Sequence, residues 1–438
     1  MWRYKRRAFA VKKIGIKQKL PHTSWSIKTF GINIMSSGQN DFIKCGSPVM
    51  NRFPFLSIKN ATFVIYPRNM IPVKLSNTSQ SDIVAMGTRL IKAMKDSGYE
   101  YLMLNRGVNS VVNIDLNSII QSIDFNTSDI QVYPSGNGKA ELRKAINEEY
   151  FNNQALPEHI LITAGGISGL DICLQNIRVD KVWLPPLFWG TYSQLMNLRE
   201  LATESYPEYD WLLKNAARLS GNAVIICDPG NPAGEKLPDE QLLELIKKLD
   251  KQGVVVIFDS PYRRLFYDRS DILYQQLMQL EMVVIIESFS KSVGLSGQRI
   301  GFMYNQNKKF IDGASLRLMY ATNGINAFAQ TIITKLLATP EGQKVVTDFK
   351  KITIQHIAAN IEFLKQNRLL ANELYKSTQP LGIFVVVNRS PEELFQHRIG
   401  SVGLDYFTLK SFKGMENLSR ILVSYPHEKF VSFFRTIL

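Results

Sequence analysis

The chain has 438 residues, of which 45% are hydrophobic and 21% are charged, values typical of a soluble globular protein with ample length to bury a core. No apolar run reaches the roughly 18 residues that a membrane-spanning helix needs. The three cysteines, Cys45, Cys173 and Cys227, lack metal-ligand spacing. We therefore expect no membrane span and no metal site, and a reducing compartment.

The net charge of +14 is concentrated at the amino terminus. Residues 1–40 contain nine Lys or Arg and no acid, so the rest of the chain carries only +5. This stretch is interpreted as a leader outside the fold before Met35 or Met50, as an organelle presequence, or as a basic contact arm. The expected location is cytoplasmic, or mitochondrial if residues 1–40 are a presequence. No nucleic-acid partner is expected, because the body of the chain is not strongly basic.

Hydrophobic periodicity predicts helices over Asp82–Ser97 and Glu141–Phe151. Six short apolar strands are predicted after these helices: His159–Thr163, Lys181–Leu184, Ala223–Cys227, Val254–Phe258, Met282–Ile286 and Ile300–Tyr304. Helical stretches separate several of them, the clearest over Pro238–Gly253. This alternation predicts an α/β fold with a mainly parallel sheet covered on both faces.

After residue 305 the pattern changes to longer helices, around 326–338 and 341–366, and two final strands, Ile383–Val387 and Arg420–Ser424. These elements predict a smaller α+β domain. We expect a basic extension over 1–80, part of the small domain over 81–130, a large domain over 131–320 and the rest of the small domain over 321–438.

Five predicted strands end in polar or unusual residues, and open α/β sheets bind ligands at the carboxyl ends of their strands. In chain order these ends carry Gly165-Gly166-Ile167, Phe188-Trp189, Asp228-Pro-Gly-Asn231, Asp259-Ser-Pro-Tyr262 and Ser288-Phe-Ser290-Lys291. Paired glycines at a helix start expose N–H groups to a phosphate, and a buried carboxylate needs a cation or donor. Lysine forms Schiff bases with carbonyl cofactors. Each motif alone also fits an ordinary turn, core or surface position.

In this order, the five motifs resemble those of fold-type I, class I/II aminotransferases, which use pyridoxal phosphate. The resemblance covers about residues 95–438, and Ser288–Gly301 fits the family's cofactor-attachment motif at every constrained position. It implies a large domain with a seven-stranded type of sheet that binds the cofactor, plus the smaller α+β domain.

The resemblance also implies residue roles. Lys291 is the catalytic residue, which holds the cofactor as an aldimine and moves the substrate's proton. Asp259 pairs with the pyridine nitrogen, and Asn231 and Tyr262 hydrogen-bond the phenolic oxygen. The remaining implied cofactor contacts are ring stacking by Trp189 and phosphate binding by Gly166, Ile167, Ser288, Ser290, Arg299 and, from the neighbouring subunit of a homodimer with shared active sites, Tyr133. Arg420 binds the substrate carboxylate, and Gly107 corresponds to the substrate-side loop.

The function implied is transfer of an amino group from an L-amino acid to a 2-oxo acid, in amino acid metabolism or biosynthesis. Two alternatives use the same cofactor: an elimination, cyclisation or oxidation of an amino acid, and a pyridoxal phosphate-binding transcriptional regulator. The regulator is disfavoured because residues 1–80 show no helix-turn-helix pattern. The chain departs from the family in a shortened stretch between Phe384 and Arg420. Residues 320–330 contain no arginine, so aspartate is not supported as the preferred donor.

Overall fold

The computed structural model describes residues 34–37, 62–65, 76–376 and 378–438. The chain divides into two units, residues 1–75 and 76–438. In the first unit, β1 (Ile34–Ser37) and β2 (Thr62–Ile65) pair antiparallel. Most of the basic stretch over 1–40 lies outside the described residues. Within the described part of the chain, no helix is both long and apolar enough to span a bilayer.

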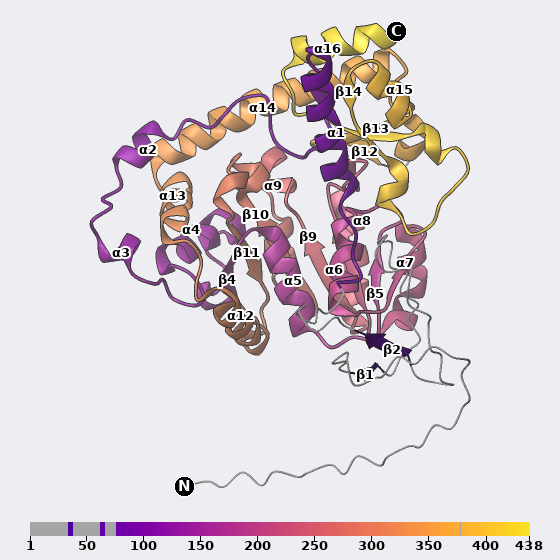
Figure 1. Ribbon diagram of the computed structural model, residues 1–438. Coiled ribbons are helices and arrows are strands. Elements are labelled where there is room, and N and C mark those ends of the chain that lie inside the picture. Colours follow the sequence, from indigo (N-terminus) through magenta and orange to yellow (C-terminus); the bar gives the residue numbers. More distant parts are fainter. Residues whose placement is uncertain (1–33, 38–61, 66–75, 377) are drawn as a thin grey trace, which may run out of the picture. The chain divides into compact units, whose positions relative to one another are not determined.

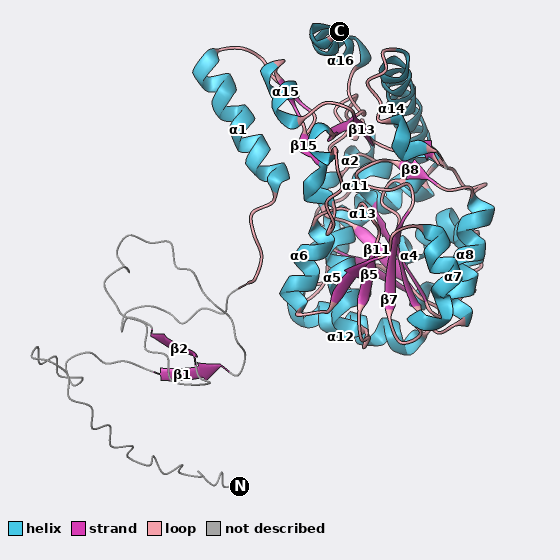
Figure 2. Cartoon of the chain, turned by 90° about the vertical axis from the view of Figure 1, so that its right-hand side faces the viewer, coloured by secondary structure: helices cyan, strands magenta, loops and turns pink. Residues whose placement is uncertain are grey.

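The second unit is built around a seven-stranded sheet (Figures 1 and 2). Its strand order is β4 (Ile160–Thr163), β11 (Gly301–Tyr304), β10 (Val283–Ser288), β9 (Val255–Asp259), β7 (Ala223–Cys227), β5 (Val182–Leu184) and β6 (Thr203–Ser205). All neighbours pair parallel except those of β11, which runs antiparallel to β10 and β4. The predicted fold class is confirmed.

Most residues of the central strands are apolar because helices cover both faces of the sheet (Figure 2). Every residue of β4, β7 and β10 is buried. The helices around the sheet are α4 (Ala140–Phe151), α5 (Gly166–Asn176), α6 (Thr191–Arg199), α7 (Tyr209–Asn215), α8 (Asp239–Lys251), α10 (Leu273–Leu277), α12 (Lys308–Thr322) and α13 (Ala327–Ala338). In α8, for example, the buried residues Leu242, Leu245, Ile246 and Leu249 form one face.

A second hydrophobic core lies beside the large sheet and includes Leu102, Ile357, Phe384 and Phe430. The elements around it are α1 (Asp82–Ser97), β3 (Leu102–Met103), α14 (Pro340–Gln366), α15 (Pro391–Gln396), β14 (Ile399–Gly400) and α16 (His427–Phe434), with the sheet β13 (Phe384–Val387), β16 (Ser419–Leu422) and β15 (Val402–Gly403). The short helices α2 (Asn117–Gln121) and α3 (Ser128–Gln131) precede α4. The pair β8 (Glu235–Lys236) and β12 (Gln379–Pro380) links segments far apart in sequence. The exact domain limits stay a prediction.

Candidate active site

The ends of neighbouring strands bring Lys291 and Asp259 to one edge of the large sheet. Asp259 is the last residue of β9, and its register partner in β10 is Ile286. The chain then turns into α11 (Phe289–Ser292), which carries Lys291. Because β9 and β10 are parallel, both side chains lie at the carboxyl edge, where this class of sheet binds ligands.

Lys291 has the electrostatic setting of a reactive amine. Its Nζ donates to the carbonyl oxygen of Gly107. Burial, together with the cations Arg299 and Arg420, lowers the pKa of Lys291 from its ordinary 10.5 to about 8. A fraction of the amine is therefore neutral near pH 7, as nucleophilic attack on a carbonyl requires.

Asp259 is a buried carboxylate with a single hydrogen-bond donor among the described residues. It is 3% exposed, and burial raises its pKa to about 7. Its donor is the hydroxyl of Tyr192, which opposes the rise in pKa. The sequence did not point to Tyr192, although it lies only three residues after Trp189, and the two rings meet edge to face at 5.8 Å.

A cradle of small residues and donors surrounds the start of α5. Gly165 has φ of +81°, and a side chain there would overlap the guanidinium of Arg299. Arg299 Nη1 donates to Ser290 Oγ over 3.4 Å, and Ser290 Oγ lies 3.0 Å from Ser288 Oγ. Gly166 and Ile167 open α5 with backbone N–H groups at its amino end. The helix terminus, two hydroxyls and one guanidinium suit a phosphate.

Arg420 lies on β16, the middle strand of the small sheet β13–β16–β15. It is 1% exposed, and its guanidinium lies 4.1 Å from the Phe384 ring centroid and 4.7 Å from that of Phe407. Nη1 donates to Asn231 Oδ1 over 3.2 Å, and Nη2 donates to the carbonyl oxygen of Asn105. Burial lowers the pKa of Arg420 to about 10, still high enough to keep the side chain charged at neutral pH.

Asn231 connects Arg420 with Tyr262, because its Nδ2 also donates to the Tyr262 hydroxyl over 3.2 Å. The structure thus connects Asn231 and Tyr262 with Arg420, and Gly107 with Lys291. Gly107 itself packs on Phe384, which a side chain at position 107 would overlap. Tyr133 is not part of this cluster: it is 79% exposed and lines a separate hollow of about 540 Å³ bordered by 130–134 and 322–327.

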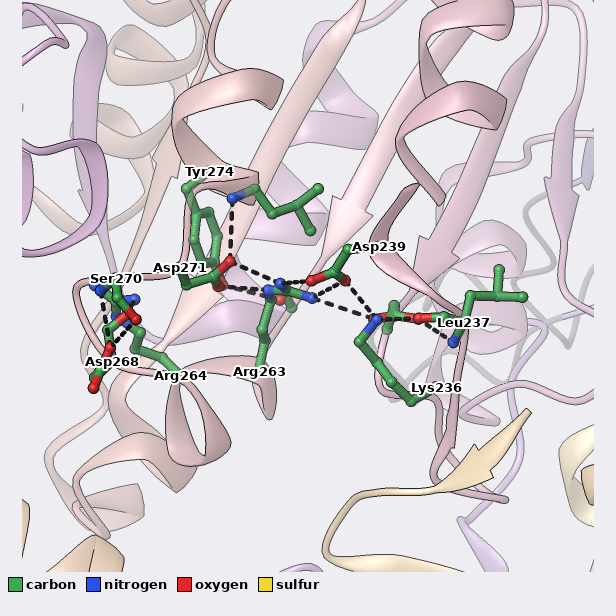
Figure 3. Close-up of polar contacts among 12 residues, drawn as sticks. Lys236, Leu237, Asp239, Arg263, Arg264, Asp268, Ser270, Asp271 and Tyr274 are labelled. Carbon is green, nitrogen blue, oxygen red and sulfur yellow. Dashed lines mark hydrogen bonds and ion pairs between the residues drawn. The ribbon is translucent and has the colours of Figure 1, made fainter. Parts of the chain in front are cut away.

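An ion network fixes the two segments that carry Asn231 and Tyr262 (Figure 3). Arg263, which follows Tyr262 and begins α9 (Arg263–Phe266), is fully buried and donates to Asp271 and Asp239 over 2.6–2.9 Å. Lys236 donates to Asp239 over 2.6 Å and lies 3.1 Å from Asp228, the residue that opens the Asn231 turn. Buried pairs with good geometry hold their partners in one arrangement.

The α/β fold with this edge of the sheet defines a class of protein: a fold-type I pyridoxal phosphate-dependent enzyme. The residues fit that cofactor. The buried amine of Lys291 suits its aldehyde, the buried Asp259 carboxylate suits its ring nitrogen, and the cradle at Gly165, closed to any Cβ, suits its phosphate.

Known proteins lead to the same class. Residues 100–423 match the family model described as aminotransferase class I and II. The chain is 25% identical over 284 residues to a histidinol-phosphate aminotransferase of Brachyspira hyodysenteriae, covering 60% of this chain and 77% of that protein. It is 28% identical over 236 residues to an aspartate aminotransferase of Bacillus subtilis, covering 49% and 58%. A crystal structure of a Mycobacterium tuberculosis aminotransferase matches with a TM-score of 0.71 and 17% identity, covering 84% of this chain and 98% of that one.

The chain therefore belongs to the class I and II aminotransferase family. It is an enzyme of the transaminase type, and its family is pyridoxal phosphate-dependent.

Proposed function

We propose that this enzyme moves an amino group from an L-amino acid to a 2-oxo acid, with Lys291 as the catalytic residue. The observation that carries the proposal is the pairing of a buried amine, whose pKa is about 8, with a buried carboxylate on the adjacent strand. Bound pyridoxal phosphate supplies an electron-withdrawing ring that stabilises negative charge at the substrate's α-carbon. Lys291 would hold the cofactor through its amine and, once released by the substrate, would carry the substrate's proton.

The neighbouring side chains orient the reaction. Asp259 would hold a proton on the pyridine nitrogen, and Asn231 and Tyr262 would hydrogen-bond the phenolic oxygen. Arg420 binds the substrate's α-carboxylate with its planar fork, for which it gives up its bonds to Asn231 and Asn105. Trp189 would cover the ring, and Gly166, Ile167, Ser288, Ser290 and Arg299 would bind the phosphate.

A homodimer with shared active sites is part of this proposal. Several large hydrophobic side chains are exposed: Val132 and Tyr133, which line the hollow bordered by 130–134 and 322–327, and Leu316, Met319 and Tyr320 on α12, whose last residue, Thr322, also lines it. An exposed apolar surface of this kind favours a partner, and a second copy would deliver its Tyr133 to the phosphate.

The reaction is tested by adding amino acids to the purified, cofactor-loaded enzyme. Transamination predicts loss of the visible absorption band and its return on adding a 2-oxo acid. Release of ammonia or peroxide, with no return of the band, would instead support elimination or oxidation. Lys291→Ala should remove the visible band altogether, whereas Lys344→Ala, a substitution on an exposed helix face, should keep it.

Sharing of sites is tested with two inactive variants, Tyr133→Ala and Lys291→Ala. Random mixing of subunits makes half of the dimers hybrid. Each hybrid holds one intact site out of two, so activity should return to about a quarter of the wild-type value. Subunit exchange is verified independently. If the mixture then shows no recovery of activity, shared sites are refuted.

A further inference from the structure

Arg106 occupies a special place in the loop beside the site. It lies between Asn105, whose carbonyl oxygen accepts from Arg420, and Gly107, whose carbonyl oxygen accepts from Lys291. The loop backbone at Arg106 therefore lies between the group proposed to bind the α-carboxylate and the group proposed to act at the α-carbon. A substrate side chain begins at this α-carbon.

The guanidinium of Arg106 is exposed and has no hydrogen bond or ion pair among the residues that the structure describes. It lies against α1 at Gly87, where a Cβ would lie 3.0 Å from Nη2 and 3.3 Å from Nε. The absence of a side chain at Gly87 is what leaves this space. Gly87 is buried within α1, where glycine costs helix stability relative to alanine.

Arg89, on the same helix, shows the contrast. Its guanidinium pairs with Glu392 at 2.8 Å and lies 3.6 Å from the Phe395 ring centroid. Asp82, at the start of α1, forms no ion pair with Arg106 among the residues that the structure describes; partial burial and the neighbouring Asp405 raise the pKa of Asp82.

We propose that Arg106 binds a second anionic group, a distal carboxylate or phosphate, on the side chain of the amino acid substrate. An arginine fork is suited to both groups, since it donates two parallel hydrogen bonds to either. Arg106 thereby supplies the cation that residues 320–330 lack. This inference rests on the proposed function and names the substrate class of the same site.

The test compares charged and neutral donors of equal size on the loaded enzyme. For wild type, kcat/KM should favour glutamate over glutamine and aspartate over asparagine, or O-phospho-L-serine over L-serine if the natural anion is phosphate. In Arg106→Ala this preference should fall at least about 30-fold, while the neutral donors change less than about threefold. Arg106→Lys should keep part of it, because the charge remains without the fork. Arg89→Ala, the matched control, should keep all of it.

A second readout does not depend on turnover. Calorimetric binding of succinate, which has two carboxylates, should weaken in Arg106→Ala far more than binding of butyrate, which has one. Gly87→Ala provides a variant that is expected to fold better than wild type, and it should reduce the same preference by crowding the guanidinium.

Equal losses for charged and neutral donors in Arg106→Ala, or a wild-type enzyme with no preference for a second anion, would overturn the inference. Failure of the proposed function has a different signature: no donor, charged or neutral, would bleach the visible band and let a 2-oxo acid restore it.

Discussion

The hydrogen bond from Tyr192 to Asp259 offers a quantitative test of how the site sets its charge. Replacing Tyr192 by phenylalanine keeps the buried ring and removes the only donor that Asp259 has among the described residues. A hydrogen bond to a charged group contributes about 1.5–3 kcal/mol. Because about 1.4 kcal/mol corresponds to one pKa unit, the pKa of Asp259 should rise from about 7 to about 8–9. At pH 7.5 the ionised fraction would fall from about three quarters to about one quarter or less.

The assay is the affinity of the apoenzyme for pyridoxamine phosphate between pH 6 and 9.5, because this ligand binds without a covalent bond to Lys291. The proposed role of Asp259 predicts tighter binding as the carboxylate ionises, with a midpoint near pH 7 in wild type and one to two pH units higher in Tyr192→Phe. Tyr206→Phe is the control: Tyr206 is equally buried, and its hydroxyl donates to the backbone carbonyl of Ile225 over 3.2 Å. An unmoved midpoint in Tyr192→Phe, or an equal movement in both variants, would refute the reasoning.

Three further outcomes are expected. The apoenzyme should capture pyridoxal phosphate at a rate that rises with pH and levels off above about pH 8, because the neutral amine of Lys291 is the form that reacts. At pH 7 the neutral fraction of Lys291 is about 300-fold higher than that of an amine with a pKa of 10.5. The capture rate is measured by stopped-flow absorption, and a plateau reached only above pH 10 would contradict this expectation. Arg420→Ala should lower kcat/KM for every amino donor by about 30- to 1000-fold and leave cofactor affinity within a few-fold, as equilibrium titration would check. Burial and Asp228 raise the pKa of Glu235 from 4.5 to about 7 in the folded protein. The folded state therefore favours the protonated carboxyl, and the protein loses stability as the pH rises from about 4.5 to 7. Glu235→Gln should therefore stabilise the apoprotein by about 1–3 kcal/mol at pH 8 and leave it unchanged at pH 4, measured by urea unfolding.

The strands were predictable wherever burial on both faces makes a strand uniformly apolar. The prediction over Ala223–Cys227 coincides with β7. The prediction over Met282–Ile286 stops two residues short of the end of β10 at Ser288. Glu287 breaks the apolar run, yet it pairs with Phe302 of β11, a contact decided by tertiary structure. The strand β6 was not predicted because Thr203–Ser205 is short and polar.

The residues of the candidate site also fall into a group that the sequence could predict and a group that it could not. Residues at strand ends were predictable, because the carboxyl edge of a parallel sheet collects them whatever the loops do. Tyr192 and Arg106 were not. The contact of Tyr192 with Asp259 depends on how α6 lies against a strand 67 residues later in the chain. The position of Arg106 depends on how α1 approaches a loop 19 residues after Gly87. No local sequence pattern predicts how either helix packs.

Asn231 shows what separate residue roles leave out. Its motif predicts a contact with the cofactor, and the strand of Arg420 predicts a contact with the substrate, but the structure joins the two through one amide. The amide donates to Tyr262 through Nδ2 and accepts from Arg420 through Oδ1, so its orientation is fixed by both partners. If Arg420 turns its fork toward a substrate carboxylate, as proposed, Oδ1 would lose a charged donor and the amide would be free to adjust its bond to Tyr262. With the proposed residue roles, substrate binding and the hydrogen bonding of the cofactor's phenolic oxygen would therefore be coupled through Asn231.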